Sequence, residues 1–64
     1  MIKTIIRYSN MVMVFDKQGE QVPRYQGQYH EVKGKILKDA PPSAVFCYFS
    51  DGDNASVKVP REEW

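Results

Sequence analysis

The sequence has a single cysteine, a single histidine and almost no net charge. With only Cys47, the chain cannot form an intramolecular disulfide, which excludes the disulfide-stapled secreted mini-domains. Nine basic and eight acidic residues give a net charge of +1, too little to steer the whole chain toward nucleic acid or a membrane. No run approaches the roughly 20 apolar residues of a membrane span, and the first residues lack the apolar core of a signal peptide. We therefore expect a cytoplasmic protein with no membrane partner.

The length of 64 residues predicts a single domain spanning residues 1–64. A hydrophobic content of 42% is adequate for a folded core, so disorder is not expected. A domain of this size buries only about 60% of the surface of its unfolded chain. Its core rarely supplies more than roughly 3–5 kcal/mol. The fold is therefore either very compact or stabilised by a partner or a second copy.

The first part of the chain predicts a β-hairpin. Ile2 to Tyr8 alternates in side-chain character and is rich in β-branched residues, as expected of a strand. Ser9-Asn10 is a turn signal, and the apolar run Met11 to Asp16 follows as the second strand. Asp16 to Gly19 then has the residue types of another turn.

A helix is predicted from about Gln26 to Asp39. Tyr25, Tyr29, Val32 and Ile36 recur at helical spacing and form one apolar stripe. Gly27 weakens the helix near its start, and no strong N-cap residue precedes it.

The end of the chain predicts a second hairpin. Pro41-Pro42 ends the helix, and Ser43 to Ser50 is continuously apolar in its centre, as in a strand covered on both faces. Asp51 to Asn54 predicts a turn, and Ala55 to Val59 a last strand.

These elements predict an α+β fold with the order β-β-α-β-β. The simplest arrangement is a four-stranded antiparallel sheet of strand order 2-1-3-4, with the helix on one face. In this arrangement the helix connects the end of the second strand to the start of the third, so that the two central strands run antiparallel.

Such a sheet leaves an apolar surplus, since one helix covers only one face while the second and third strands are apolar on both. If Met11, Met13 and Phe15 meet the helix, Val12 and Val14 point away from it. We expect the candidate interaction face to comprise Ile5, Val12, Val14, Phe46 and Tyr48. Monomers rarely expose large apolar patches. Either the sheet curls into a partial barrel, or this face binds a second copy, another protein or an apolar ligand.

No residue pattern predicts catalysis, and we expect neither an enzyme nor a cofactor or metal site. His30 is expected to be a solvated surface residue and Cys47 a small buried hydrophobe. Asp51-Gly52-Asp53-Asn54 is similar to the start of a calcium loop. Ser56, however, occupies the position where such a loop needs glycine, which favours a hairpin turn.

The leading functional hypothesis is therefore a small binding module that acts through its apolar sheet face, as a homodimer or with a protein partner. The alternative is weak binding of single-stranded nucleic acid. That mode would stack bases on Phe46 and Tyr48 beside Arg7, or bring phosphates to the cationic helix side of Arg24, Lys35 and Lys38.

The pattern of residues Met11–Pro23, Tyr25–Gly27, Ile36–Pro41 and Val59–Trp64 resembles a family of small uncharacterised bacterial proteins. The resemblance extends over nearly the whole chain. It implies a stand-alone bacterial cytoplasmic protein, and it implies no particular activity.

Overall fold

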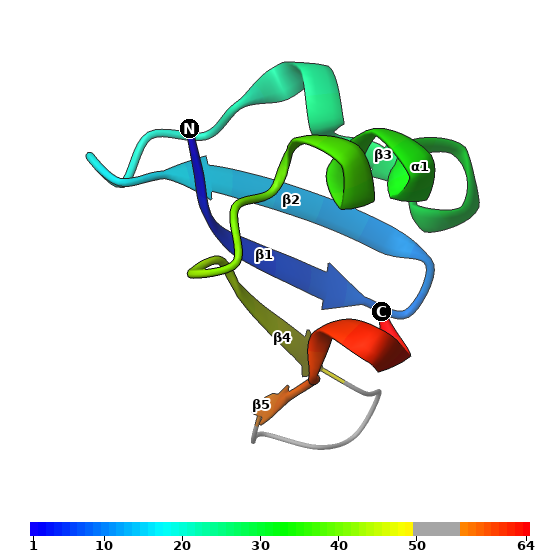
Figure 1. Cartoon of the computed structure of the whole chain (residues 1–64). Coiled ribbons are helices and arrows are strands. Elements are labelled where there is room, and N and C mark those ends of the chain that lie inside the picture. The colour runs from blue at the N-terminus through cyan, green and yellow to red at the C-terminus, as the bar shows by residue number, and fades with distance from the viewer. Residues whose placement is uncertain (50–55) are drawn as a thin grey trace.

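The computed structural model describes residues 1–49 and 56–64. Its elements are β1 (Ile2–Tyr8), β2 (Met11–Asp16), the 3-10 turn η1 (Pro23–Tyr25), β3 (Gly27–Gln28), α1 (Tyr29–Asp39), β4 (Val45–Phe49), β5 (Ser56–Lys58) and the 3-10 turn η2 (Arg61–Glu63) (Figure 1). The predicted α+β class with one α-helix is confirmed for the described residues. The predicted turn at 51–54 lies outside them.

The strands form one open, mixed sheet in the order β3-β2-β1-β4-β5. The four predicted strands therefore have the predicted neighbours, and the two-residue strand β3 adds an edge that the sequence analysis did not predict. Because β3 and β5 stand at opposite edges, the sheet does not close into the partial barrel considered as the alternative.

The central strands β1 and β4 pair in parallel, so their predicted antiparallel arrangement is wrong. The prediction had the chain run once along the length of the sheet between β2 and β4, whereas the chain runs along it twice. After β2 the chain runs back through η1 to β3, which pairs with Met11 and Val12 at the start of β2. The 11 residues of α1 then return over a length of about 16 Å. As a result, β4 starts at the same end of the sheet as β1.

The helix begins at Tyr29, later than the predicted start at Gln26, because the chain cannot be helical at Gly27. Gly27 has a φ of +139°, a conformation that side-chain-bearing residues rarely adopt, and it pairs with Val12 in the short strand β3. Tyr25 was expected on the helical stripe but lies in η1, although it is still buried.

Both predicted turns of the N-terminal half are confirmed. Ser9 takes a left-handed conformation at φ +55° and lets β1 reverse into β2. In the second turn the Gly19 N–H donates to the Asp16 carbonyl at 3.0 Å, with Gly19 at φ +83°. The Asp16 carboxylate accepts from the backbone N–H groups of Gln18 and Glu20, so its side chain satisfies the turn that follows it.

The hydrophobic core lies between α1 and one face of the sheet. From α1 it contains the predicted stripe residues Tyr29, Val32 and Ile36. From the sheet it contains Ile2, Ile5, Val12, Val14 and Phe46, none of which is more than 4% exposed. We call this the helix side of the sheet.

A β-bulge brings Ile2 into this core. Ile2 pairs with Asp16, but Thr4 pairs with Phe15, so β1 has one more residue than β2 at this point. The extra residue changes the alternation, and both Ile2 and Ile5 are buried. The simple alternation expected over Ile2 to Tyr8, which would put Ile2 and Thr4 on one face, therefore fails at the start of β1.

The C-terminal segment closes one end of the core through the indole of Trp64, which is 9% exposed. The rings of Trp64 and Phe46 have centroids 5.2 Å apart, and the indole N–H donates to the Val59 carbonyl at 3.0 Å. Arg61 reaches the last turn of the helix and donates to the carbonyls of Leu37, Ala40 and Pro41. These contacts hold η2 on the helix side of the sheet.

Candidate interaction surface and adjoining cleft

The side of the sheet opposite α1 carries a compact grid of side chains. Strand register places Ile6 at its centre, between Met13 of β2 and Cys47 of β4. One flanking row is Met11, Tyr8 and Phe49, and the other is Phe15, Thr4 and Val45. These nine residues alternate with the buried residues of the helix side and are called the open face.

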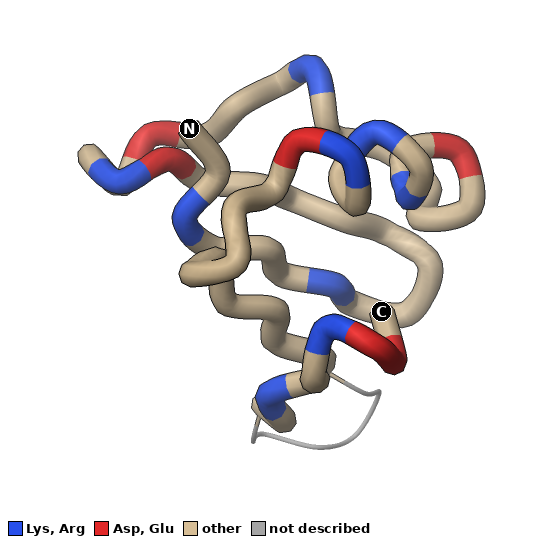
Figure 2. Tube along the Cα trace, in the orientation of Figure 1, with Lys and Arg blue, Asp and Glu red and all other residues tan. Residues whose placement is uncertain are grey.

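The open face is almost wholly apolar and carries no charge. Thr4 is its one residue outside the apolar and aromatic types, and the charge-coloured trace shows no charged residue along β4 (Figure 2). Met11 is 51% exposed, Tyr8 49% and Met13 39%, and the other members are half-buried by one another. Within residues 1–49 and 56–64, the buried residues of α1, η1 and the C-terminal segment belong to the core on the helix side.

The apolar surplus predicted from the sequence is therefore present, but on the opposite face. Ile5 and Val14 are 0% exposed, Val12 is 1% and Phe46 is 3%, because all four pack beneath α1. Tyr48 is half-buried and lies on the same side of the sheet as Phe46. The candidate interaction face expected from the sequence is thus the covered face.

Arg7 is stacked against two tyrosines at the rim of the helix side. Its guanidinium carbon lies 4.3 Å from the ring centroid of Tyr29 and 5.4 Å from that of Tyr48, and its Nε donates to the Ser9 carbonyl. Burial raises the pKa of Tyr29 above its ordinary value, and the nearby Arg7 charge opposes this in part. Of the two rings expected to stack on bases, Phe46 is buried, and Tyr48 is half-buried with Arg7 against its ring.

The cationic residues expected on one helix side come from two different elements. Lys35 and Lys38 are exposed on α1. Arg24 lies instead in η1, with its guanidinium carbon 5.3 Å from the ring centroid of Tyr25.

The residues considered for other chemistry are dispersed. His30 is solvated, as expected, with its side chain 74% exposed and its Nε2 at 3.8 Å from a carboxylate oxygen of Glu31. Cys47 was expected to be buried but is only half-buried, as a free thiol on the open face with Lys58 as its cross-strand neighbour. In the described part of the chain, no three His, Cys, Asp or Glu side chains are grouped to hold a metal. No helix there is long and apolar enough to cross a membrane.

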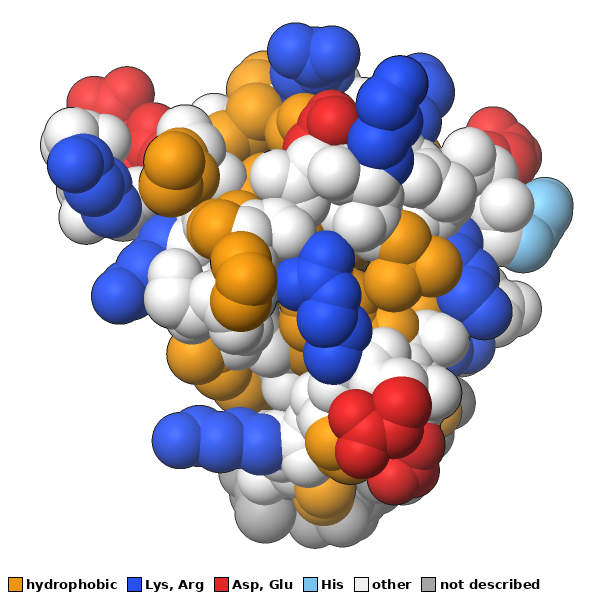
Figure 3. All heavy atoms as spheres, viewed as in Figure 1, with side chains coloured by type: hydrophobic (Ala, Val, Ile, Leu, Met, Phe, Trp, Pro, Cys, Tyr) orange, Lys and Arg blue, Asp and Glu red, His pale blue; other side chains and the backbone are white. Residues whose placement is uncertain are grey.

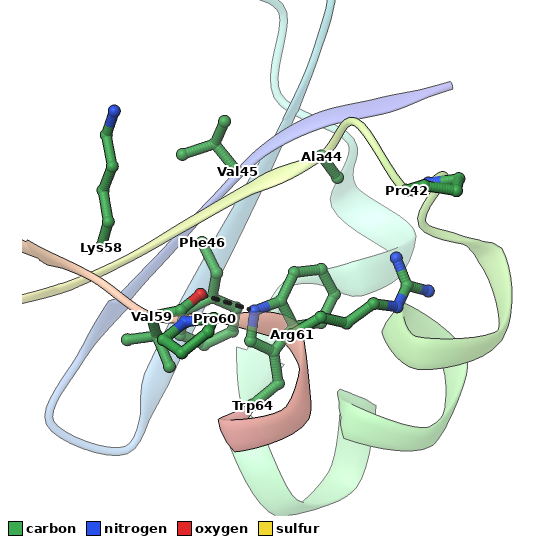
Figure 4. A pocket seen from close by; sticks show the side chains of 9 residues that line it. All are labelled: Pro42, Ala44, Val45, Phe46, Lys58, Val59, Pro60, Arg61 and Trp64. Atoms are coloured by element: carbon green, nitrogen blue, oxygen red, sulfur yellow. Dashed lines mark hydrogen bonds between the residues drawn. The ribbon is translucent and has the colours of Figure 1, made fainter.

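A cleft of about 400 Å³ adjoins the open face at the start of β4 (Figure 4). Its apolar wall includes Val45, Phe46, Val59, Pro60 and Trp64. Lys58 and Arg61 lie on opposite sides of this wall (Figure 4). On the side of the molecule that carries η2, hydrophobic side chains are exposed among Lys and Arg side chains, and acidic side chains gather over η2 itself (Figure 3).

A second, smaller cleft of about 160 Å³ adjoins Tyr25 and Asp39. The Tyr25 hydroxyl donates a hydrogen bond to the Asp39 carboxylate. This hydrogen bond, together with burial, raises the pKa of Tyr25 above its ordinary value of 10.0. The pair joins η1 to the last turn of α1 and satisfies both polar groups.

Comparison with known proteins gives no match to a family model, to a curated protein or to a solved structure.

Proposed function

We propose that the chain is a small binding module that forms a homodimer by packing its open face against the open face of a second copy. The proposal is based on the continuous apolar grid around Ile6. This grid is not part of the hydrophobic core of its own chain. Apolar patches of this kind mark interaction surfaces on soluble proteins.

A second copy suits this surface better than a charged partner. In a two-fold symmetric contact the same patch is used by both copies, so Ile6 at the centre of the grid lies close to the partner's Ile6. The nine positions carry no charge, and Lys58, the cross-strand neighbour of Cys47, stands beside them at the β5 edge and not among them. Met11 and Met13 add flexible side chains that adapt to an apposed surface.

The small size of the domain gives a second reason for self-association. A 64-residue chain buries a limited core, and a sheet-on-sheet contact would supply further apolar burial. Association through the sheet edges is less favourable, because β3 has two residues and β5 has three within residues 1–49 and 56–64.

The test is the solution mass of the purified protein, measured by light scattering from low to high micromolar concentration. We expect a mass twice that of the 7.4 kDa chain at the upper concentrations. A protein that stays monomeric throughout this range contradicts the proposal.

Two charge-introducing variants locate the contact. Met13 and Leu37 are exposed to nearly the same extent, 39% and 37%, but Met13 is on the open face and Leu37 on α1. Met13→Glu should give a folded monomer, because the contact would bury an unpaired charge. Leu37→Glu should leave the dimer intact. Equal loss of dimer in both variants, or in neither, shows that the open face is not the contact.

We also propose that the module acts in the cytoplasm. The support is Cys47, a free thiol that shares the open face with apolar side chains, because reducing compartments preserve free thiols.

A further inference from the structure

A cleft forms beside β4 because β5 is too short to cover it. β5 pairs only with Cys47, Tyr48 and Phe49, and the last bond of this ladder runs from the Val59 N–H to the Phe46 carbonyl. At Pro60 the chain turns away into η2. The side of β4 at Ala44 and Val45 therefore borders the cleft instead of a neighbouring strand.

The apolar wall of the cleft is held in place before any ligand arrives. Phe46 and Trp64 stack with their ring planes inclined by 32°, and the Trp64 indole is tied to the Val59 carbonyl. Arg61 fixes η2 to the end of α1 through three hydrogen bonds. A wall that is already ordered lowers the entropic cost of binding a rigid apolar body.

The charged residues that line the cleft are both cations. Lys58 lies at one side and Arg61 at the other, and no acidic residue is among the described residues of the lining (Figure 4). Glu62 and Glu63 of η2 are exposed and do not belong to it. Within residues 1–49 and 56–64, the one pair of opposite charges at ion-pair distance is His30 with Glu31. The Lys58 ammonium is therefore not paired with an acidic side chain of these residues, and it can bind a ligand.

We propose that this cleft binds a small amphipathic anion, with a flat apolar body along Val45, Pro60 and Trp64 and an acidic group at Lys58. The volume of about 400 Å³ is within the range of small-molecule sites. Lys58 is the anchor because three of the five N–H donors of Arg61 already bind helix carbonyls. The site adjoins the proposed dimer contact, since Val45 belongs to both surfaces and Lys58 is the cross-strand neighbour of Cys47 on the open face.

The test uses 3-phenylpropionate as the probe and the indole N–H signal of Trp64 as the readout. Trp64 is the single tryptophan of the chain, so its indole gives one assigned signal in a ¹⁵N-correlated NMR spectrum. We expect a saturable shift of this signal on titration with the acid. The uncharged analogue 3-phenylpropanamide should bind about two- to five-fold more weakly, the range expected for loss of one exposed ion pair.

Variants identify the anchor. Lys58→Gln should weaken binding of the acid by a similar factor of about two to five and leave binding of the amide unchanged. Lys17→Gln, in the exposed turn after β2, removes the same charge far from the cleft lining and should bind both probes as the unmodified chain does.

Three outcomes overturn the proposal. The Trp64 signal does not shift, the acid and the amide bind equally, or Lys58→Gln and Lys17→Gln behave alike. A chain that is monomeric but binds the acid through Lys58 would remove the proposed dimer and keep this site. A chain that forms the dimer but does not bind the acid would keep the proposed dimer and remove this site.

Discussion

Arg61 donates a hydrogen bond from Nη2 to the carbonyl of Ala40 at 2.8 Å, and this contact joins the C-terminal turn to the end of α1. The same guanidinium also donates hydrogen bonds to the carbonyls of Leu37 and Pro41. Carbonyl groups at a helix C-terminus lack partners within the helix, and a cation there is favourable with respect to the helix dipole. Arg61 is therefore the C-terminal cap of α1, supplied by a distant part of the chain.

Replacing this cap should destabilise the domain. We expect Arg61→Ala to lower the free energy of unfolding by about 1–2 kcal/mol, because three hydrogen bonds to a charged donor are lost at an exposed site. Lys35→Ala, on the exposed side of α1, should change it by less than about 0.5 kcal/mol. Urea denaturation of the two variants measures the difference. Equal effects would show that the Arg61 contacts do not stabilise the fold.

Stability should fall at alkaline pH through the buried tyrosines. The pKa values of Tyr25 and Tyr29 are raised in the folded state, so the unfolded chain loses these protons first as the pH rises. Their contribution is complete below pH 10.0, the ordinary tyrosine pKa, and is lost as the pH rises through the folded-state values. Urea midpoints measured from pH 8 to pH 11 should decline above about pH 10.

Tyr25→Phe separates the two tyrosines. At pH 8 it should cost about 1 kcal/mol, the typical effect of losing a hydrogen bond. Its stability should then decline less steeply at alkaline pH, since the raised pKa of Tyr25 is removed while that of Tyr29 remains. An unchanged decline would assign the alkaline effect to groups other than Tyr25.

Two adjacent isoleucines test which face of the sheet is covered. Ile5 is 0% exposed beneath α1, whereas Ile6 is half-buried on the open face. Ile5→Val should cost about 1 kcal/mol, because it removes a methylene from a packed core. Ile6→Val should cost less than about 0.5 kcal/mol when measured at concentrations below dimerisation. A larger cost for Ile6 than for Ile5 would reverse the assignment of the two faces.

Two glycines should respond in opposite ways to alanine. Gly34 lies within α1, and a Cβ atom there would meet nothing within 4 Å, so Gly34→Ala should stabilise the domain by about 0.5–1 kcal/mol. Gly27 has a φ of +139°, and Gly27→Ala should destabilise it by 1 kcal/mol or more despite adequate space around the site. Thermal unfolding of both variants checks the signs. Stabilisation by Gly27→Ala would contradict the backbone conformation described for β3.

Local patterns were sufficient to predict the elements and most neighbour relations. Alternation over Ile2 to Tyr8 and the stripe Tyr29, Val32 and Ile36 both correspond to observed elements. The parallel pairing of β1 and β4 was not predictable in the same way. It depends on a second crossing that includes a two-residue strand, and two residues carry no periodic signal.

The covered face was not predictable because both faces of β2 are apolar. Met11, Met13 and Phe15 on one side and Val12 and Val14 on the other satisfy the same hydrophobic pattern. On β1, Lys3 and Arg7 made the side of Ile5 look solvent-facing. The structure resolves the conflict with a bulge at Lys3 and with tyrosine rings stacked on Arg7. Neither the bulge nor the stacking of tyrosine rings on Arg7 can be predicted from a single sequence.

The parallel pairing of β1 with β4 has a consequence for how the chain acquires its fold during synthesis. Thr4 pairs with Val45 and Tyr8 with Phe49, so the centre of the sheet joins residues from nearly opposite ends of the chain. Contacts so distant in sequence form slowly, because a long loop must close first. Until β4 has left the ribosome, the hairpin of β1 and β2 keeps one strand edge unpaired. The nascent hairpin is therefore the state in which this protein is most exposed to aggregation and to capture by chaperones.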